Sequence, residues 1–241
     1  MQEFLTKGLI TSANMPLFIV GIVLCVIIPY LLGSLNFGVI ISKLRYRDDV
    51  RKHGSGNAGM TNMLRTYGKS AAIITLLGDI LKAVVSAFFG LILMPGDGFA
   101  YIAGIACMLG HAFPIYFHFK GGKGVAVALG TMLVLNPPVC GMCILIWILV
   151  VSFSKYVSLS SMIAAAIFPL INFFYPFWFA PHPVQTISSV VVAALIVWLH
   201  RQNIVRLAKG TENKFSLKKK PENIRNKLDS NKSIETKNKS K

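Results

Sequence analysis

The chain has 241 residues, of which 54% are hydrophobic and only 14% are charged, and its mean hydropathy is +0.61. Soluble domains carry about 25% charged residues, so this composition excludes the water-soluble globular class. Lys and Arg number 25 against 9 Asp and Glu, which gives a net charge of +16. We therefore expect an all-α polytopic membrane protein with its basic residues gathered on one side.

Seven apolar runs follow one another along the chain, and each is a candidate transmembrane helix. They extend over Pro16 to Ser42, Ser70 to Met94, Gly98 to Phe117, Gly124 to Leu135, Pro137 to Phe153, Ser158 to Tyr175, and Val184 to His200. The fourth run is short, because about 12 residues rising about 1.5 Å each reach only about 18 Å across a core roughly 30 Å thick. An alternative is therefore that it fuses with the fifth run through the Asn136-Pro137-Pro138 segment.

The distribution of basic residues indicates the orientation. With seven spans, one side collects Arg45, Arg47, Arg51, Lys52, Arg65, Lys69, Lys120, Lys123, Lys155 and the C-terminal tail. The loops at 95–97, 136–138 and 176–183 contain no Lys or Arg. The positive-inside rule then predicts seven spans, with the N-terminus outside and the C-terminus in the cytosol, whereas the fused alternative places Lys155 and the tail outside.

The last part of the chain differs from the rest in composition. Residues 213–241 contain 10 basic and 3 acidic residues and almost no apolar ones. We expect residues 1–212 to form a single membrane domain and 213–241 to be a disordered cytosolic tail. The alternative role for the tail is attraction to anionic lipid head groups; nucleic-acid binding is not expected, because no aromatic residues are interleaved with the lysines.

The four cysteines all lie in apolar runs, at positions 25, 107, 140 and 143. Cys140 and Cys143 form a C-x-x-C pair, but neither a redox fold nor other metal-ligating residues accompany them in the sequence. We therefore interpret them as small apolar helix residues and expect neither a disulfide framework nor a metal site.

The first polar segment, residues 53–65, contains Gly54, Gly56 and Gly59 among Ser, Asn and Thr residues. Glycines in such a setting adopt positive φ and let consecutive N–H groups point at an anion. The spacing matches G-x-G-x-x-G, but no strand precedes it, which argues against dinucleotide binding.

The second polar segment is Lys120-Gly121-Gly122-Lys123-Gly124, which leads into a predicted helix. Two lysines and three glycines at a helix N-terminus combine fixed charge, N–H groups and the helix dipole, as in a phosphate cradle. The alternative is a flexible basic turn anchored to lipid phosphates. The segment is not a Walker A loop, since Gly rather than Ser or Thr follows Lys123.

The third polar segment follows the last span. His200, Asn203 and Arg206 share one helix face, which suits contact with a bound substrate. The alternative is that His and Arg are placed there against the dipole at the helix end. Two further charges, Asp79 and Lys82, lie three residues apart in the second span, where we favour a structural ion pair over a substrate pathway.

Together these segments resemble the bacterial acyl-phosphate:glycerol-3-phosphate acyltransferase family, integral membrane enzymes that make lysophosphatidic acid. The resemblance extends to Glu212 and includes Gly33-Ser34, the Asp79 and Lys82 pair, and the YVSLSS segment at 156–161. It implies seven helices in the bacterial cytoplasmic membrane, an active site facing the cytosol, and no cofactor. The implied substrates are acyl phosphate and glycerol-3-phosphate, and the implied partners are membrane lipids and the soluble enzyme that supplies acyl phosphate.

The resemblance also assigns roles to individual residues. Catalytic roles fall to Ser55, Arg65, Lys123, His200 and Asn203. Contacts with substrate or phosphate fall to Gly54, Gly56, Asn57, Asn62, His111, Lys120, Gly121, Gly122, Gly124, Ser161 and Arg206, and a structural role falls to Glu212. Four positions depart from the family pattern, Asn36, Met60, Ala83 and Val127, and we expect these to change local packing and one hydroxyl contact.

The chemistry that the resemblance implies needs no covalent acyl-enzyme, because acyl phosphate already carries a good leaving group. The proton acceptor stays open between His200, His111 and a substrate phosphate oxygen. Two other classes remain as alternatives, a transporter of a phosphorylated metabolite and a lipid-binding scaffold. Against the transporter, the apolar runs show no inverted repeat and the polar groups gather on one face.

Overall fold

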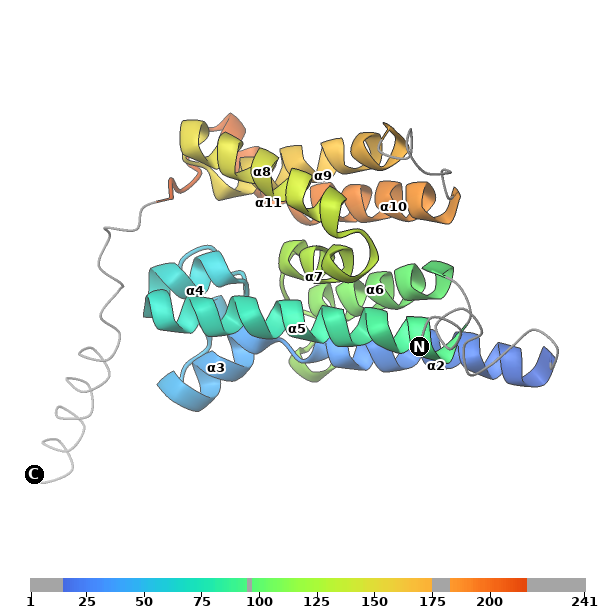
Figure 1. Ribbon diagram of the computed structural model, residues 1–241. Coiled ribbons are helices and arrows are strands. Elements are labelled where there is room, and N and C mark those ends of the chain that lie inside the picture. The colour runs from blue at the N-terminus through green and yellow to red at the C-terminus, as the bar shows by residue number, and fades with distance from the viewer. Residues whose placement is uncertain (1–14, 95–96, 175–182, 216–241) are drawn as a thin grey trace, which may run out of the picture. The chain divides into compact units, whose positions relative to one another are not determined.

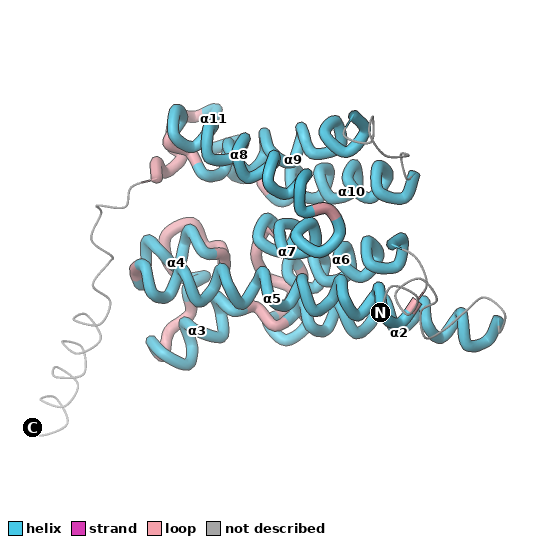
Figure 2. The backbone as a smooth tube through the Cα atoms, in the orientation of Figure 1, coloured by secondary structure: helices cyan, strands magenta, loops and turns pink. Residues whose placement is uncertain are grey.

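The computed structural model describes residues 15–94, 97–174 and 183–215, and within these ranges every regular element is a helix (Figures 1 and 2). The α-helices are α2 (Met15–Ser34), α3 (Phe37–Tyr46), α4 (Met60–Tyr67), α5 (Lys69–Leu93), α6 (Asp97–Ala112), α7 (Val125–Leu135), α8 (Pro137–Ser154), α9 (Val157–Phe174), α10 (Pro183–Leu199) and α11 (Arg201–Ala208). Two short 3₁₀ turns, η1 (Val50–Lys52) and η2 (Ile115–Phe117), lie between them.

The helices confirm the all-α polytopic class. Among the described residues, five segments are long and apolar enough to cross a membrane, the first being Met15–Tyr46, which contains α2 and α3. A sixth is added if α10 and α11, bent by 54° at His200, count as one segment. Helix α7 is apolar but has only 11 residues. The seven crossings and the orientation of the termini therefore remain predictions.

The chain divides into two compact units. Of the described residues, the first contains 15–36, 78–94, 97–174 and 183–215, and the second contains 37–77. Helices α2 and α6 to α11 belong to the first unit, α3 and α4 belong to the second, and α5 contributes to both. The predicted single domain over residues 1–212 stays a prediction, and most of the predicted tail lies outside the described residues.

The first unit is held together by small side chains. Helix α2 packs on α6, α6 on α7 and α10, and α9 on both α8 and α10 (Figure 1). The interior is rich in Ala, Met and Cys, and all four cysteines are buried as free thiols. Large apolar side chains such as Leu81, Leu145 and Phe173 are more than half exposed. This arrangement is typical of membrane helices, which approach closely through small residues and turn large ones toward lipid.

Two of the family departures lie in this interior. Ala83 and Val127 are fully buried and pack in the same apolar cluster as Cys107 and Met108. Their side chains carry no polar group, so their contribution at these positions is packing.

The predicted span from Pro16 to Ser42 is wrong in one respect, because the helix is broken. Helix α2 ends at Ser34 and α3 begins at Phe37, so Leu35 and Asn36 are not helical. The Ser34 hydroxyl at the break donates to the Tyr30 carbonyl (2.9 Å) and accepts the Ile115 N–H (3.3 Å), which ties the end of α2 to η2. An apolar run continuous in sequence therefore does not imply a continuous helix.

The other predicted boundaries agree closely with the helices. Ser70 to Met94 corresponds to α5, and Ser158 to Tyr175 corresponds to α9. Helices α7 and α8 are separate, because Asn136 leaves the helical conformation and its side chain accepts the Val139 N–H at the start of α8. The helix predicted from Gly98 to Phe117 ends earlier, at Ala112, since Pro114 follows and the chain turns through η2.

Close contact between α2 and α6 depends on glycine. A Cβ atom on Gly33 would lie 2.0 Å from the carbonyl oxygen of Cys107, and one on Gly110 would lie 2.1 Å from that of Tyr30. Both clashes are with backbone, which cannot rotate away as a side chain can. The two helices therefore approach each other only because neither position carries a side chain.

We expect Gly33→Ala to lower the melting temperature in detergent by about 2–12 °C, because overpacking that displaces a helix costs about 1–3 kcal/mol and each kcal/mol shifts the melting temperature of a chain of this size by about 2–4 °C. Thermal unfolding followed by intrinsic fluorescence measures this. The matched control is Gly141→Ala in α8, where an added Cβ would meet no described atom within 4 Å. Equal melting temperatures for the two variants would contradict the packing argument.

Candidate active site

The loop between α6 and α7 folds back onto the end of α6. The N–H groups of Gly121 and Gly122 donate to the carbonyls of Ala112 (3.1 Å) and His111 (3.0 Å). The expectation that this loop aims glycine N–H groups at a phosphate is therefore wrong for these two, since both are used within the chain. Gly124 then adopts a positive φ of 79°, which suits glycine, and α7 begins at Val125.

The start of α7 keeps the capacity to bind an anion. None of the described side chains caps it, so the N–H groups of its first turn retain the positive end of the helix dipole. Lys123 lies directly before this turn and is half-buried, whereas Lys120 is exposed. The site for a phosphate thus depends on the lysines and the helix start rather than on the glycine N–H groups of the loop.

The second and third polar segments meet at Lys123 and Asn203. The Lys123 Nζ donates to the Asn203 Oδ1, and the Asn203 Nδ2 donates to the Glu212 Oε1 at 2.9 Å. Asn203 is buried on α11. Its amide oxygen faces the Lys123 ammonium, while Glu212 accepts from its amide nitrogen and so fixes the orientation of the amide. The structure therefore brings together two predicted catalytic residues and the predicted structural residue.

Glu212 is the centre of a polar cluster that closes the C-terminal side of this site. Its Oε2 accepts the Arg206 Nε at 2.8 Å in an ion pair, and its Oε1 accepts the Ser158 hydroxyl at 3.0 Å. Arg206, assigned to phosphate from the sequence, thus uses one donor of its guanidinium within the chain. Just beyond, the Phe215 N–H donates to the Lys155 carbonyl at 2.7 Å, so the chain after α11 is tied to the turn between α8 and α9.

Ser158 is a site residue that the sequence analysis missed. The sequence places it only within the YVSLSS segment at 156–161, with no role of its own. Ser161, assigned to substrate from the sequence, instead donates to the Val157 carbonyl (2.9 Å) and accepts the Trp147 indole N–H (3.1 Å). Ser and Glu in sequence-distant positions give no periodic signal, so only the folded chain identifies the Ser158–Glu212 contact.

His200 lies at the bend between α10 and α11 and is 3% exposed. Its Nδ1 lies 2.8 Å from the Ile196 carbonyl oxygen, which only accepts hydrogen bonds, so the Nδ1 carries the proton. The Nε2 of the neutral ring is then the nitrogen with a lone pair. The bend therefore fixes which side of the imidazole is able to accept a proton.

Acidification is expected to open the Glu212 cluster. Burial alone would raise the pKa of Glu212, but the hydrogen bonds from Arg206, Asn203 and Ser158 outweigh it and hold the pKa below its ordinary value of 4.5. The stability that the ionised carboxylate contributes is therefore fully present above about pH 4.5 and is lost as the pH falls through the lowered pKa. Melting temperatures between pH 7 and pH 3 measure the loss, and Glu212→Gln should remove this part of the pH dependence.

The first polar segment is organised by Asn62 in the second unit. The Asn62 Oδ1 accepts the Ser55 N–H at 3.0 Å, and its Nδ2 lies 3.0, 3.0 and 2.9 Å from the carbonyl oxygens of Val50, His53 and Asn57. Asn62 is 2% exposed. An amide assigned to substrate from the sequence is therefore occupied by the backbone of its own loop.

The loop around Asn62 needs glycine and uses several of its own N–H groups. Gly54 and Gly56 have positive φ of 56° and 70°, and a Cβ on Gly54 would lie 2.3 Å from the Asn62 Oδ1. The Gly56 N–H donates to the His53 carbonyl (2.9 Å), and the Gly59 N–H donates to the Asn57 Oδ1 (3.0 Å). The Ser55 side chain, half-buried on this loop, remains as a polar group that the loop can present.

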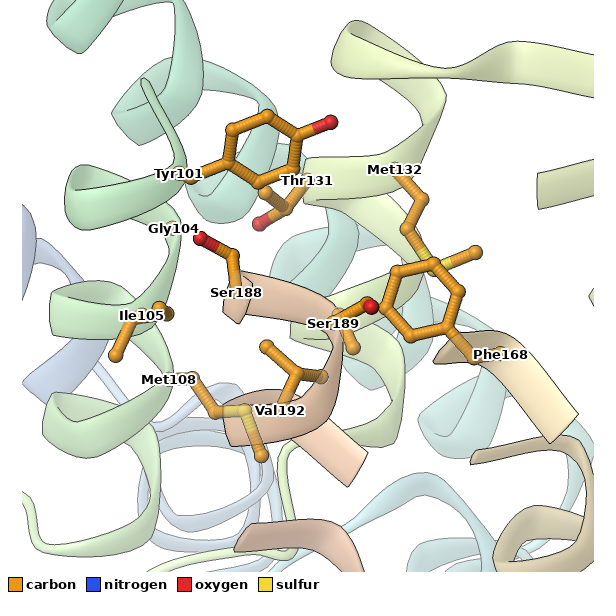
Figure 3. A pocket seen from close by; sticks show the side chains of 11 residues that line it. Tyr101, Gly104, Ile105, Met108, Thr131, Met132, Phe168, Ser188, Ser189 and Val192 are labelled. Carbon is orange, nitrogen blue, oxygen red and sulfur yellow. The ribbon is translucent and has the colours of Figure 1, made fainter. Parts of the chain in front are cut away.

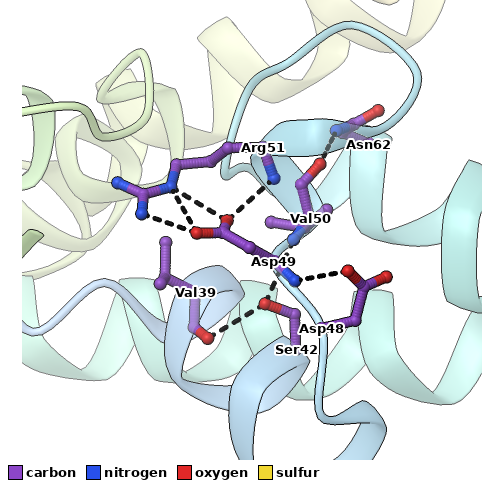
Figure 4. A network of polar contacts seen from close by, with 7 residues as sticks. All are labelled: Val39, Ser42, Asp48, Asp49, Val50, Arg51 and Asn62. Carbon is purple, nitrogen blue, oxygen red and sulfur yellow. Dashed lines mark hydrogen bonds and ion pairs between the residues drawn. The ribbon is translucent and has the colours of Figure 1, made fainter.

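The turn before this loop is fixed by a second polar network, which Figure 4 shows. The Asp49 carboxylate accepts the Arg51 N–H and guanidinium, the latter at 2.7–3.2 Å, and Asp48 accepts the Asp49 N–H at 2.7 Å. The Ser42 hydroxyl donates to the Val39 carbonyl and accepts the Val50 N–H. Arg65 follows on α4, where it is half-buried. Arg51 is therefore a structural residue of this unit.

We expect Asn62→Asp to lower the activity of this site at least tenfold, because aspartate keeps the acceptor for Ser55 but turns oxygen toward three carbonyls that need a donor. A buried acceptor without a donor costs about 1–3 kcal/mol, and here several are affected together. Initial rates on purified protein measure the effect. The control is Gln202→Glu, the same change of an amide to a carboxylate at an exposed position on α11. Wild-type rates for the Asn62 variant would rule out its organising role.

The described residues also line a small cavity away from these polar groups. Figure 3 shows side chains from α6, α7, α9 and α10 around it, among them Tyr101, Met132 and Phe168. Its volume is about 20 Å³, which suits about one water molecule, whereas ligand pockets are typically about 300 Å³ or more. The cavity is therefore not a substrate site in this conformation.

Within the described ranges, no three His, Cys, Asp or Glu side chains are grouped as metal ligands require.

Comparisons with known proteins agree with this arrangement. A family model described as glycerol-3-phosphate acyltransferase matches residues 23–210. The glycerol-3-phosphate acyltransferase of Halalkalibacterium halodurans is 45% identical over 199 residues, covering 81% of this chain and 96% of that protein. Two crystal structures of PlsY (YgiH), an integral membrane glycerol 3-phosphate acyltransferase, also match. Its glycerol 3-phosphate form has a TM-score of 0.74 at 36% identity, and its lysophosphatidic acid form has 0.71 at 35%. Each match covers 81% of this chain and 96% of that one.

Proposed function

Because this chain belongs to the glycerol-3-phosphate acyltransferase family and is an integral membrane acyltransferase, we propose that it uses acyl phosphate as the donor. The fatty acyl group passes to the 1-hydroxyl of glycerol-3-phosphate, and the products are lysophosphatidic acid and phosphate. The glycerol 3-phosphate and lysophosphatidic acid forms of PlsY support the acceptor and the product.

The observation that carries the proposal is the fixed ammonium of Lys123 beside the start of α7. Asn203 and Glu212 hold Lys123 in place before any substrate arrives, so its charge needs no reorganisation to meet a phosphate. The N–H groups of the first turn of α7 add a second positive feature. Both features suit an acyl phosphate, whose phosphate is anionic and leaves as an anion.

The reaction follows from these groups. The oxygen of the glycerol-3-phosphate hydroxyl attacks the acyl carbon, a new C–O bond forms, and the bond from the acyl carbon to the phosphate oxygen breaks. Lys123 stabilises the negative charge that moves onto the departing phosphate, an effect of a few kcal/mol. No covalent acyl-enzyme is needed, since positioning of two bound reactants supplies much of the barrier reduction.

For the proton of the hydroxyl we propose an oxygen of the departing phosphate as the acceptor. His200 then orients the substrate through the lone pair on its Nε2, together with Asn203. In the first polar segment, the Ser55 hydroxyl is the group available for orientation. Arg65, in the first polar segment, binds a substrate phosphate. Lys120, in the second polar segment, adds positive charge near Lys123. The acyl chain lies along apolar helix surfaces open to the bilayer.

The cellular setting follows from the charge distribution. The positive-inside rule places the polar segments at the cytosolic face of the bacterial cytoplasmic membrane, where a soluble enzyme supplies the acyl phosphate. Neither a cofactor nor nucleic acid has a role in this reaction.

The test is to mix the purified protein in detergent with glycerol-3-phosphate and palmitoyl phosphate and to measure lysophosphatidic acid by mass spectrometry. We expect product with acyl phosphate and none with palmitoyl-CoA as the donor. Product from palmitoyl-CoA alone would overturn the donor assignment. Uptake of labelled glycerol-3-phosphate into vesicles without any acylation would instead support transport.

A further inference from the structure

Three charged or ionisable side chains form a buried cluster in the first unit. Asp79 and Lys82 lie on α5 and His111 lies near the end of α6, and these side chains are 2%, 5% and 2% exposed. The Lys82 Nζ and Asp79 Oδ1 are 2.8 Å apart, which confirms the predicted ion pair. The reaction proposed above uses neither Asp79 nor Lys82 directly, so their burial in an apolar segment needs another explanation.

Lys82 satisfies the end of α2. Its Nζ donates to the carbonyls of Gly33 and Leu35, both at 2.9 Å, at the point where α2 stops and its last carbonyls have no helical partner. Without a donor, such carbonyls in an apolar environment cost several kcal/mol. The same Nζ lies 3.0 Å from the Nδ1 of His111 and 2.8 Å from the Asp79 Oδ1.

Contacts from α5 hold the His111 ring at its Nδ1. This nitrogen lies 3.0 Å from the Lys82 Nζ and 3.4 Å from the Asp79 Oδ1, and both of these residues belong to α5. The imidazole is therefore held by α5 in one orientation.

The held imidazole supports the second polar segment. A Cβ on Gly122 would lie 2.0 Å from the His111 Nε2 and 2.6 Å from its Cε1, so the backbone of Gly122 rests directly on the ring. The main chain reinforces this, since the His111 carbonyl accepts the Gly122 N–H. Lys123 is the next residue. The position of its backbone thus depends on a ring whose orientation is set by Lys82.

We propose that Asp79, Lys82 and His111 are positioning residues, and that their buried cluster sets the Lys120–Gly124 loop against the broken end of α2. The proposal rests on the function above for the role of Lys123, and it replaces substrate contact as the role of His111. In this arrangement Gly122 is required because an imidazole, and not a ligand, occupies the space beside it.

A double-mutant cycle of His111→Asn and Gly122→Ala tests this directly. Asparagine keeps an acceptor near the position of Nδ1 for Lys82 but removes the Nε2 and Cε1 that face Gly122. We expect Gly122→Ala alone to raise the KM for acyl phosphate at least tenfold and to lower the melting temperature, because the phosphate of this substrate is the one that Lys123 meets. In the His111→Asn background, the same substitution should change KM less than about twofold.

The matched control is His118→Asn, an exposed histidine in the same loop region with a φ of 55° that asparagine tolerates; adding it should leave the effect of Gly122→Ala unchanged. An equal loss from Gly122→Ala in both backgrounds would overturn the proposal. So would a His111→Asn variant that folds normally but loses kcat as completely as Lys123→Ala, because His111 would then act on the substrate.

The melting temperatures keep the two proposals separable. If the wild-type chain makes no lysophosphatidic acid from acyl phosphate, the proposed donor fails, yet the coupling between residues 111 and 122 is still read from thermal stability. If Gly122→Ala does not fold, recovery of folding in the double variant supports the contact and continued misfolding contradicts it. A wild-type chain that is active but shows no coupling refutes the positioning role alone.

Discussion

Replacing Lys123 by alanine is expected to lower kcat/KM for acyl transfer by about 100- to 1,000-fold, with the melting temperature little changed. Loss of one preorganised donor to a developing anion typically costs about 2.7–4 kcal/mol, which corresponds to this range. Lys123 is half-buried and its ammonium is held by Asn203, so its charge is preorganised in the same sense. Steady-state rates on purified protein, with lysophosphatidic acid quantified by mass spectrometry, provide the measurement.

The control for this variant is Lys209→Ala, an exposed lysine at the end of α11. It removes the same charge from the chain without touching the start of α7, so we expect rates within about twofold of the wild-type value. Near-normal turnover by Lys123→Ala under these conditions would exclude Lys123 from the active site. Equal losses in both lysine variants would show that the effect is one of total charge.

Replacing Lys82 by methionine should cause the largest loss of stability, about 3–5 kcal/mol, which is typical when one partner of a buried ion pair is removed. Methionine has a similar length, so packing changes little. The loss arises because Asp79 is left as an uncompensated buried charge and the Gly33 and Leu35 carbonyls lose their donor. Fluorescence-detected gel filtration and thermal unfolding in detergent report the folded fraction.

The companion variant combines Lys82→Met with Asp79→Asn. It removes the unpaired charge while leaving the two carbonyls unsatisfied, so it should recover part of the stability. A Lys82→Met protein as stable as the wild type would show that the cluster contributes no net energy. Full recovery in the double variant would assign the whole cost to the charge and none to the end of α2.

The sequence predicts most of the helices because a membrane imposes a minimum apolar length that hydropathy detects directly. The break at Leu35 and Asn36 escapes this test, since the apolar run continues through it. What permits the break is Lys82 on another helix, whose ammonium replaces the missing helical donors. Such a compensation between helices leaves no trace in local composition.

The candidate site shows the same division between local and non-local information. Short motifs predict Lys123, Asn203 and Ser55 as candidate site residues, because the residues that form a glycine-rich turn or a helix face are close in sequence. The Ser158–Glu212 contact joins segments that are far apart in sequence, so no spacing rule reveals it. The sequence also does not tell whether a glycine N–H is open to a ligand, as Gly121 shows.

The tie between Phe215 and Lys155 has a practical meaning for anyone who shortens this enzyme. Three side chains converge on Glu212, and the main chain is then secured once more at Phe215. A stop codon before Glu212 deletes the carboxylate that steadies Asn203, and with it the support of Lys123. Affinity tags and reporter fusions for purification therefore belong downstream of Phe215, where they leave that support in place.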